Sequence, residues 1–564
     1  NNKEKILTIS DNGIGMNEED LKSSLGTIAR SGTKAFLEQV ASNTKDKKSD
    51  MSMIGQFGVG FYASFMVADS VEVVSKKAGE EQAWKWSSDG KTGFDLVKTD
   101  KETAGTSITL KLKKDAKEFL EETRLQFVVR KYSDHISYPV KLLEIDKKDA
   151  EEKTLNEASA LWTRPSKDIT EEQYQEFFSH IGAGFGKPLL TMHNNTEGTI
   201  SYTNLICIPS TRPFDLFNPD RKSSLKLYIN RVFITDKCDA LVPSYLRFIK
   251  GLVDTQDIDL NVSREMLQNN PAVSKISKSL VGKILRELKK VSEKNIDGYK
   301  DFWKEYGAVL KEGLYEDAER KDTLLDLCRF STNENDEIMS LSSYLDKMPE
   351  NQKEIYYISA ETRSQALASP HLEGFKSKNI PVLIMTDAID QFWLPMIGSF
   401  KDKKFTSITQ GQINLDDLDE KNKDKKSESK DQKEKQDKEY VDLIAQMKVV
   451  LGEHVKDIRL SSKLTDSPVC LVADDGDMDI AMEQLMAQRD TNYKGAPRIL
   501  EINGDHSLIK NMKSLLSKKE NNDLVSDAGT LLFEQARLLE GKMPADPAQF
   551  SKIMNQFLLK AIPE

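Results

Sequence analysis

The stretch ILTISDNGIGM occupies residues 6–16, and a second glycine-rich stretch, GQFGVGF, occupies residues 55–61. ILTIS is typical of a strand, and the Asp-Asn-Gly that follows it is a favoured hairpin turn. A second interpretation is open. Gly13 and Gly15 would let the backbone pass close to a flat ligand. Asp11 would then be held in a pocket, where a purine's exocyclic amine would supply the hydrogen bond that a buried carboxylate needs.

GQFGVGF also has two interpretations. Its glycines permit backbone conformations that are closed to other residues, so a structural turn is one of them. The other is an anion site, because freed N–H groups beside the amino end of a helix suit phosphate. The helical stretch YASFMVA directly follows. The pattern is neither Walker A nor the dinucleotide fingerprint.

The order of the motifs carries more information than either motif alone. LGTIARSGTKAFLEQV (residues 25–40) lies between them, and Gly26 and Gly32 would hinge it as a lid over a nucleotide. AGTSI comes later, where Thr106 would offer a hydroxyl inward from a strand. Asp-x-Gly-x-Gly, a hinged lid, Gly-x-x-Gly-x-Gly and Gly-Thr, in that order, resemble the GHKL ATPases.

Composition excludes several functional classes. At 564 residues the chain is too long for one hydrophobic core. The net charge of −10 argues against nucleic acid as the main ligand, and no apolar run approaches the roughly 20 residues that span a bilayer. The four cysteines have no CxxC pair and the six histidines are scattered, so we expect neither a disulfide framework nor a metal site, and a reducing compartment.

The fold predicted is a multidomain mixture of α+β and α/β. Residues 1–144 mix short strands with helices, including TSITLKLK from Thr106, and residues 145–157 are typical of a linker. Residues 158–415 form a longer α/β region. In it LKLYINRVFI (residues 225–234) is predicted as one strand, and EIYYISA and PVLIMT flank a helix in a βαβ unit.

The last part of the chain changes character. Residues 416–439 contain ten acidic and eight basic residues, so we expect a mobile tether. Residues 440–564 are mainly helical. Two amphipathic helices at their end, with stripes at residues 524–539 and 550–561, would pack internally or pair with another copy.

Downstream motifs decide which GHKL branch the chain resembles. IGQFGVGFYASFMVAD, LGTIARSGTKAF, KYSDHISYP, LKLYINRVFI, YLRFIKGLVD and DLNVSREMLQ are similar to signatures of the heat-shock protein 90 (Hsp90) chaperones, and above all to the bacterial branch. The resemblance covers essentially the whole chain. It implies a GHKL (Bergerat) α/β-sandwich ATPase domain, an α/β middle domain and a mostly helical dimerisation domain. It also implies a homodimer that uses ATP and Mg²⁺ to remodel non-native client proteins in the stress response.

The resemblance also assigns roles to single residues. Asp11 would hold the adenine amine, supported by the backbone at Gly15 and Met16, and Thr106 would close the adenine end. The phosphates would be lined by Gly58, Gly60 and Phe61. Many members have an asparagine before the LGT motif where this chain has Ser24, so that contact is in doubt.

Two motifs of the middle region would act on the nucleotide from a neighbouring domain. Arg264, in NVSREMLQ, would reach the γ-phosphate, because a permanently charged guanidinium suits the charge of phosphoryl transfer. Gln268 would share its helical face. A surface arginine is the alternative. PFDLF (residues 213–217) resembles the loop that docks on the closed lid, and a plain hydrophobic turn is the alternative.

A methionine stripe offers a client surface. Met478, Met482 and Met486 recur every four residues after DDGD. Core packing is the default for such a stripe. Methionine is also soft and rich in rotamers, which suits a surface that binds many partners. We therefore hypothesise a helix that contacts clients.

Three competing interpretations remain at this point. A topoisomerase or MutL-like GHKL enzyme is disfavoured by the acidic charge, and a sensor kinase would need a histidine-bearing helix before its ATPase domain. A nucleotide-independent scaffold leaves the two glycine motifs without a role. The ending LLKAIPE lacks the acidic MEEVD-type tail by which eukaryotic cytosolic members recruit co-chaperones, which favours a bacterial or organellar protein. The sequence shows no signal peptide, so we expect a cytoplasmic location, with an organellar one as the alternative.

The family's upstream helix, with its catalytic glutamate and metal-coordinating asparagine, has no counterpart after Asn1, which already lies just before a strand. We therefore expect the polypeptide of residues 1–564 to show no steady-state ATP hydrolysis above background and no tight ATP binding. A phosphate-release assay, with heat-denatured protein as the blank, measures this. Turnover above that blank would contradict the assignment of the glutamate to an upstream segment.

Overall fold

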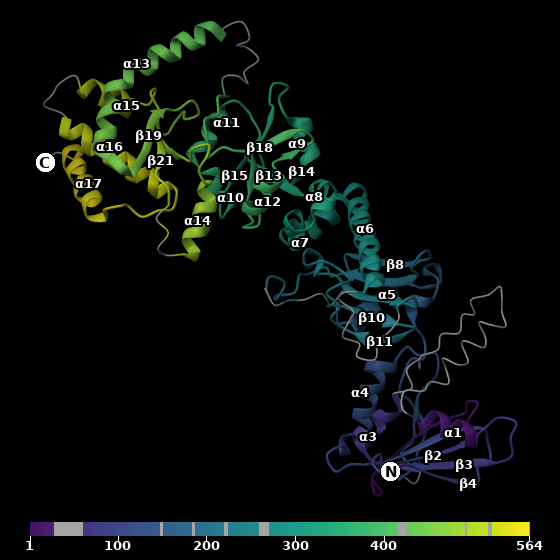
Figure 1. Ribbon diagram of the computed structural model, residues 1–564. Coiled ribbons are helices and arrows are strands. Elements are labelled where there is room, and N and C mark those ends of the chain that lie inside the picture. Colours follow the sequence, from purple (N-terminus) through teal and green to yellow (C-terminus); the bar gives the residue numbers. More distant parts are fainter. Residues whose placement is uncertain are drawn as a thin grey trace. The chain divides into compact units, whose positions relative to one another are not determined.

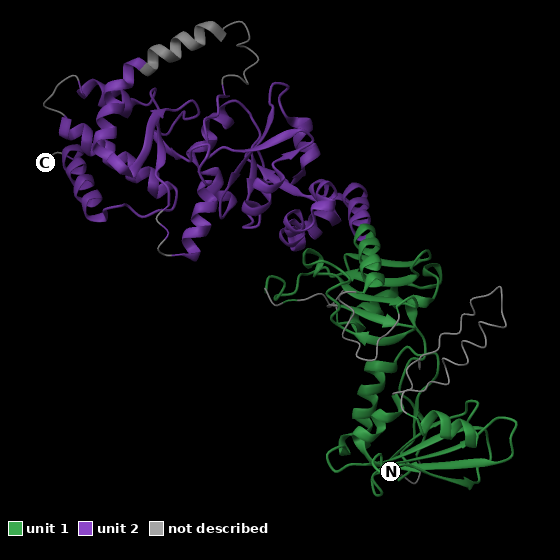
Figure 2. Cartoon of the chain, viewed as in Figure 1, with its two compact units in different colours: residues 1–283 green, residues 284–564 purple. Residues whose placement is uncertain are grey.

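The computed structural model describes residues 1–27, 60–146, 150–182, 187–218, 221, 224–258, 270–415, 426–490, 493, 495–516 and 522–562. These residues fall into two compact units, Asn1–Lys283 and Ile284–Glu564, which Figure 2 distinguishes by colour. In the described part of the chain, no helix is both long and apolar enough to cross a bilayer.

An antiparallel sheet opens the first unit, with the strand order β1-β5-β2-β3-β4. Its helix α1 is fixed at its start by a capping box: the Asn17 side chain accepts the Asp20 N–H (3.0 Å), and the Asp20 carboxylate accepts the Asn17 N–H (3.2 Å). Leu21 and Leu25 of α1 pack on the sheet, over one face of it in Figure 1. The elements are β1 (Ile6–Asp11), α1 (Glu18–Leu25), α3 (Ser64–Val67), β2 (Ala68–Lys76), β3 (Ala83–Ser88), β4 (Asp95–Thr99) and β5 (Gly105–Leu112). The strands expected at ILTIS and TSITLKLK are confirmed.

A helical stretch and a second sheet complete the first unit. The stretch expected over residues 116–134 is a 3₁₀ turn (Lys117–Leu120) followed by α4, and α4 packs against β11. The second sheet has the order β11-β10-β12-β9-β8, with β10 and β12 parallel. The elements of this part of the chain are α4 (Glu122–Ser133), β6 (Lys141–Leu142), β7 (Lys153–Thr154), α5 (Glu171–His180), β8 (Leu190–Thr196), β9 (Tyr202–Ile208), β10 (Ser224–Ile229), β11 (Val232–Thr235) and β12 (Lys250–Thr255).

One expectation for this region was wrong in detail. LKLYINRVFI is a hairpin and not one strand, because Asn230 (φ 52°) and Arg231 (φ 63°) both adopt the left-handed conformation that a tight two-residue turn requires. The linker expected at residues 145–157 includes β7, which pairs with β6. The domain boundaries themselves remain predictions.

The second unit begins inside α6 and contains a six-stranded sheet in the order β14-β13-β16-β15-β18-β17. β15 and β16 run parallel around α10 and α11, which confirms the expected βαβ unit. The elements are α6 (Pro271–Lys294), α7 (Ile296–Glu316), α8 (Lys321–Leu327), β13 (Arg329–Thr332), β14 (Met339–Ser340), α9 (Leu341–Lys347), β15 (Glu354–Ser359), α10 (Arg363–Leu367), α11 (Glu373–Ser377), β16 (Leu383–Met385), α12 (Asp390–Ile397), β17 (Ser399–Phe400) and β18 (Lys403–Ser407).

A buried ion pair fixes α7 against the start of α12. The Lys311 ammonium lies 2.7 Å from both carboxylate oxygens of Asp390 and 2.7 Å from Asp387, and Trp393 donates its indole N–H to Asp390 (2.8 Å). Burial alone would lower the pKa of Lys311, but the two carboxylates more than offset this and raise it. The ammonium therefore stays charged, and removing either partner would leave a costly uncompensated charge.

The last part of the chain contains a small sheet in the order β19-β21-β20, with helices packed beside it (Figure 1). Its elements are α13 (Lys426–Leu451), β19 (Val455–Leu460), β20 (Val469–Val472), α14 (Ile480–Arg489), β21 (Arg498–Ile502), α15 (Ser507–Leu516), α16 (Asn522–Leu539) and α17 (Pro547–Ala561). α13 differs from expectation, because it includes residues 426–439 of the charged segment. Tyr440, Leu443 and Met447 anchor its later part in the core, and lysine, glutamate and glutamine favour continuation of the helix before them.

Candidate functional site

The candidate nucleotide site begins where β1 ends beside β5. Asp11 is the last residue of β1 and pairs with Thr106 in the strand register. The Asp11 carboxylate accepts the Gly13 N–H (2.9 Å), which shapes the turn after the strand. Asp11 is exposed, whereas the sequence suggested a buried carboxylate. Among the described residues, β1 lies at the edge of its sheet, beside β5.

Glycine is required at two positions beside Asp11. Gly15 has φ +68°, and a Cβ there would lie 1.9 Å from the Lys76 carbonyl oxygen. Gly105 has φ +123°, and a Cβ there would lie 2.2 Å from the Asp11 carbonyl oxygen. Both conformations are strained for a residue with a side chain. The DNGIGM turn therefore lies directly on the ends of β2 and β5.

A buried serine that sequence reasoning missed joins the predicted residues. The Ser75 hydroxyl lies 2.9 Å from the Thr106 hydroxyl and accepts the Met16 N–H at 2.8 Å. Ser75 is fully buried and Thr106 nearly so. A signal for Ser75 exists in the sequence, because Val71, Val73 and Ser75 alternate along β2 and the first two are core residues. Asp11, Gly15, Met16 and Thr106 thus lie together.

Of the second motif, only its end belongs to the described residues. Gly60 and Phe61 open a 3₁₀ turn (Gly60–Ala63) that leads into α3. Phe61 contacts Trp86 edge-on, with ring centroids 5.4 Å apart, and packs with Met16 against the core of the sheet. The expected helix behind the loop is only the four-residue α3, so its macrodipole adds little to an anion site.

Several predicted residues lie outside the described part of the chain. They are Gly58, Arg264 and Gln268, together with most of the proposed lid after residue 27. Ser24 is half-buried within α1.

Comparison with known proteins identifies the family. A family model described as "Hsp90 protein" matches residues 143–563, and one described as "Histidine kinase-, DNA gyrase B-, and HSP90-like ATPase" matches residues 1–118. The chain belongs to the Hsp90 family. It is accordingly a multidomain ATP-dependent molecular chaperone with a GHKL nucleotide-binding domain.

Curated relatives are similar along nearly the whole chain. "Chaperone protein HtpG" of Roseobacter denitrificans is 47% identical over 562 residues, which is 99% of this chain and 88% of the relative. The protein of the same name from Paramagnetospirillum magneticum is 47% identical over 556 residues, with the same coverage. That from Geobacter sulfurreducens is 42% identical over 576 residues, covering 98% of this chain and 87% of the relative.

The PFDLF loop of this Hsp90 chain presents an aromatic ring to solvent. Phe214 is fully exposed and Phe217 is half-exposed, while Leu216 is buried between them. The Leu216 carbonyl accepts a hydrogen bond from the Arg247 guanidinium (2.9 Å), which anchors the loop. The arrangement suits a loop that docks on another surface, and its docking on the lid stays a prediction.

The methionine stripe lies partly outside its expected helix. α14 begins at Ile480, so Met478 precedes the helix. Met478 is 39% exposed, and Met482 and Met486 are half-buried. None of the three has the full burial that the core interpretation predicts.

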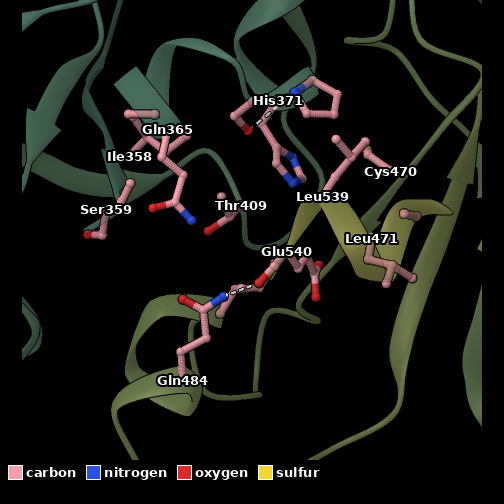
Figure 3. A pocket seen from close by; sticks show the side chains of 16 residues that line it. Ile358, Ser359, Gln365, His371, Thr409, Cys470, Leu471, Gln484, Leu539 and Glu540 are labelled. Carbon is pink, nitrogen blue, oxygen red and sulfur yellow. Dashed lines mark hydrogen bonds between the residues drawn. The ribbon is translucent and has the colours of Figure 1, made fainter. Parts of the chain in front are cut away.

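The Hsp90 chain also has a small cavity with both polar and apolar lining residues in its second unit, of about 60 Å³. Figure 3 shows His371 and Glu540 among the side chains that line it, and the Gln484 amide donates to the Glu540 backbone carbonyl at 2.5 Å. Burial lowers the pKa of His371 and raises the pKa of Glu540 to about 7. None of the residues predicted for the nucleotide site lines this cavity, and its size would admit an ordered water molecule.

Comparing Gly15→Ala with Gly79→Ala separates two effects of adding a Cβ: a clash with neighbouring atoms and the cost of a positive φ angle. Gly79 also has positive φ (+85°), but a Cβ there meets nothing within 4 Å. We expect Gly79→Ala to cost about 1–2 kcal/mol of unfolding free energy, and Gly15→Ala clearly more, because its Cβ would collide with β2. Urea unfolding followed by circular dichroism measures both. Equal losses would mean that the turn after β1 moves away from β2 at little cost.

Proposed function

We propose that this Hsp90 chaperone binds ATP where β1 ends beside β5, and that nucleotide-driven closure of a homodimer remodels its client proteins. The observation that carries the proposal is the convergence of Asp11, Gly15, Met16 and Thr106 around buried Ser75. It combines a carboxylate, backbone that a side chain would obstruct, and a fixed hydroxyl, in a domain of a nucleotide-binding family.

Each residue would have a distinct role. The Asp11 carboxylate would accept the adenine amine, and the Gly15 and Met16 backbone would lie along the base. Ser75 would hold the Thr106 hydroxyl at the adenine end. The Phe61 ring packs on Trp86. The backbone of Gly58, Gly60 and Phe61 would line the phosphates.

The γ-phosphate end of the proposal rests on the family resemblance. Arg264 would neutralise the charge of the terminal phosphate, and Gln268 would act beside it. Mg²⁺ would accompany ATP. Among the described residues, a group of three potential metal ligands is found at Asp134 and not around Asp11, so no step here depends on the ion.

Homodimerisation is proposed through the last helix. Ile553 of α17 is buried, but Met554, Leu558 and Leu559 of α17 and Ile562 directly after it are 42–77% exposed. An apolar face of this size on a terminal helix favours pairing with a second copy over internal packing alone.

The remaining proposals concern organisation and setting. We retain a nucleotide domain at residues 1–144, a linker at 145–157, a middle domain at 158–415, a charged linker at 416–439 and a dimerisation domain at 440–564. The cytoplasm of a bacterium is the proposed location, with non-native proteins as clients and co-chaperones as possible further partners.

Asp11→Asn tests the nucleotide site. Asparagine removes the charged acceptor, and hydrogen bonds to charged groups contribute about 1.5–3 kcal/mol. We expect adenine nucleotide binding to weaken by about tenfold to a hundredfold. Saturation-transfer NMR with ADP at millimolar concentrations detects even weak binding.

Asp89→Asn is the matched control, because Asp89 is also an exposed aspartate that accepts backbone N–H groups in a turn. It should leave the ADP signal unchanged. If both variants bind ADP as the unaltered chain does, Asp11 is not the adenine contact.

Replacing Met478, Met482 and Met486 together by glutamine tests the client surface. We expect weaker suppression of the aggregation of a heat-unfolded model protein, because the soft apolar surface is lost. The oligomeric state measured by light scattering should not change. Loss of soluble folded chain would instead assign the three side chains to the core.

A further inference from the structure

A cluster of potential metal ligands lies in the first unit, outside the nucleotide site. Asp134 and His135 directly follow α4, and Glu157 comes from the segment after β7. One ligand atom from each of the three residues lies within 4.8 Å of the others. The sequence separates Glu157 from the other two by more than 20 positions, so spacing alone does not reveal the cluster.

The Asp134 carboxylate is held in place. Its side chain is 5% exposed, and one of its oxygens accepts the Glu157 N–H at 3.1 Å. Its backbone carbonyl accepts the Ala158 N–H at 3.0 Å. The other carboxylate oxygen lies 3.8 Å from Nε2 of His180, the last residue of α5. A buried carboxylate in this position needs a positive partner.

The His135 ring is held in place by two contacts. Its Nδ1 lies 2.9 Å from the Ser159 carbonyl oxygen, which only accepts, so Nδ1 carries the proton and Nε2 presents a lone pair. Metal-binding histidines commonly donate their other ring N–H to a carbonyl in this way. The ring also lies edge-on to Trp162, at 4.6 Å between centroids, which restricts its rotation.

The segment that carries Glu157 is tied to α4 by a built network. The Asn156 side chain accepts the Val140 N–H (2.7 Å) and donates to the carbonyls of Ser133 (3.2 Å) and Tyr138 (3.0 Å). Ala158 has φ 53°, an uncommon conformation for a residue with a Cβ. Such strain persists where the surroundings impose it, and it concentrates at functional positions.

The local field favours a cation. Asp134 and Glu157 contribute two carboxylates, and the carboxyl-terminal ends of α4 and α5, with their partial negative charge, lie beside them. Burial lowers the pKa of Lys226, and the nearby carboxylates of Asp236 and Asp134 act in the opposite direction. A divalent ion would neutralise the negative charge of both carboxylates.

We propose that Asp134, His135 and Glu157 bind a divalent transition metal ion of the zinc type. A mixed imidazole and carboxylate set suits Zn²⁺, whereas Mg²⁺ and Ca²⁺ prefer oxygen ligands alone. The ion would connect the end of α4 to the segment after β7, and it would act as a structural clamp independent of the nucleotide.

Titration of the full chain with Co²⁺ and Zn²⁺ tests the site. We expect one Co²⁺ per chain with a visible ligand-field spectrum, displaced by Zn²⁺, and micromolar or tighter Zn²⁺ affinity by calorimetry. Glu157→Gln and His135→Gln should each weaken binding at least tenfold. Glu157 is exposed, so its variant keeps the test valid if His135→Gln disturbs packing on Trp162.

His454→Gln is the matched control, because His454 is an exposed histidine outside the cluster. It should leave Zn²⁺ affinity unchanged. Zn²⁺ should also raise the thermal unfolding midpoint of the unaltered chain and not that of Glu157→Gln. Affinity weaker than millimolar, equal binding by Glu157→Gln, or Mg²⁺ binding as tight as Zn²⁺ would each overturn the proposal.

Discussion

The proposed nucleotide site depends on one steric constraint: the turn after β1 packs so closely on β2 and β5 that a Cβ fits at neither Gly15 nor Gly105. Gly15 and Gly105 satisfy this constraint with positive φ angles. Only because the turn lies so close does the Ser75 hydroxyl reach both the Met16 N–H and Thr106. A larger residue at Gly15 or Gly105 would push the Asp11 carboxylate away from the Thr106 hydroxyl. Sheet geometry, and not a flexible loop, therefore sets the spacing of the proposed adenine contacts.

In the second unit the corresponding constraint is electrostatic. Lys311 is enclosed by Asp387 and Asp390, and Trp393 supplies the remaining donor. Such a group is weak evidence for stability, because burying charges costs about as much as their attraction returns. What the contacts do show is that Lys311 of α7 is paired with both aspartates at the start of α12. Close packing at glycines positions the turn after β1 in the first unit, and a buried ion pair positions α7 against α12 in the second.

Sequence reasoning reached the family, the fold class, β1, β5 and the βαβ unit, because local periodicity and glycine spacing report on single elements. It missed features that depend on context. Asn230 and Arg231 form a tight turn that divides an apparently continuous strand sequence. The turn contains no glycine, so the sequence does not mark it. α13 continues into a charged stretch because its later part is anchored in the core. Ser75 and the group at Asp134 become visible only when strands and loops distant in sequence are brought together. The roles of Arg264 and Gln268 rest on family resemblance alone.

All four cysteines are free and buried, and burial raises the pKa of each thiol, to about 11 for Cys207 and about 12 for Cys328. Thiolate is the form that reacts with peroxide and alkylating agents. The folded chain therefore offers such reagents almost no nucleophilic sulfur, although it carries no disulfide. The four thiols therefore become reactive toward such reagents only when the core around them opens.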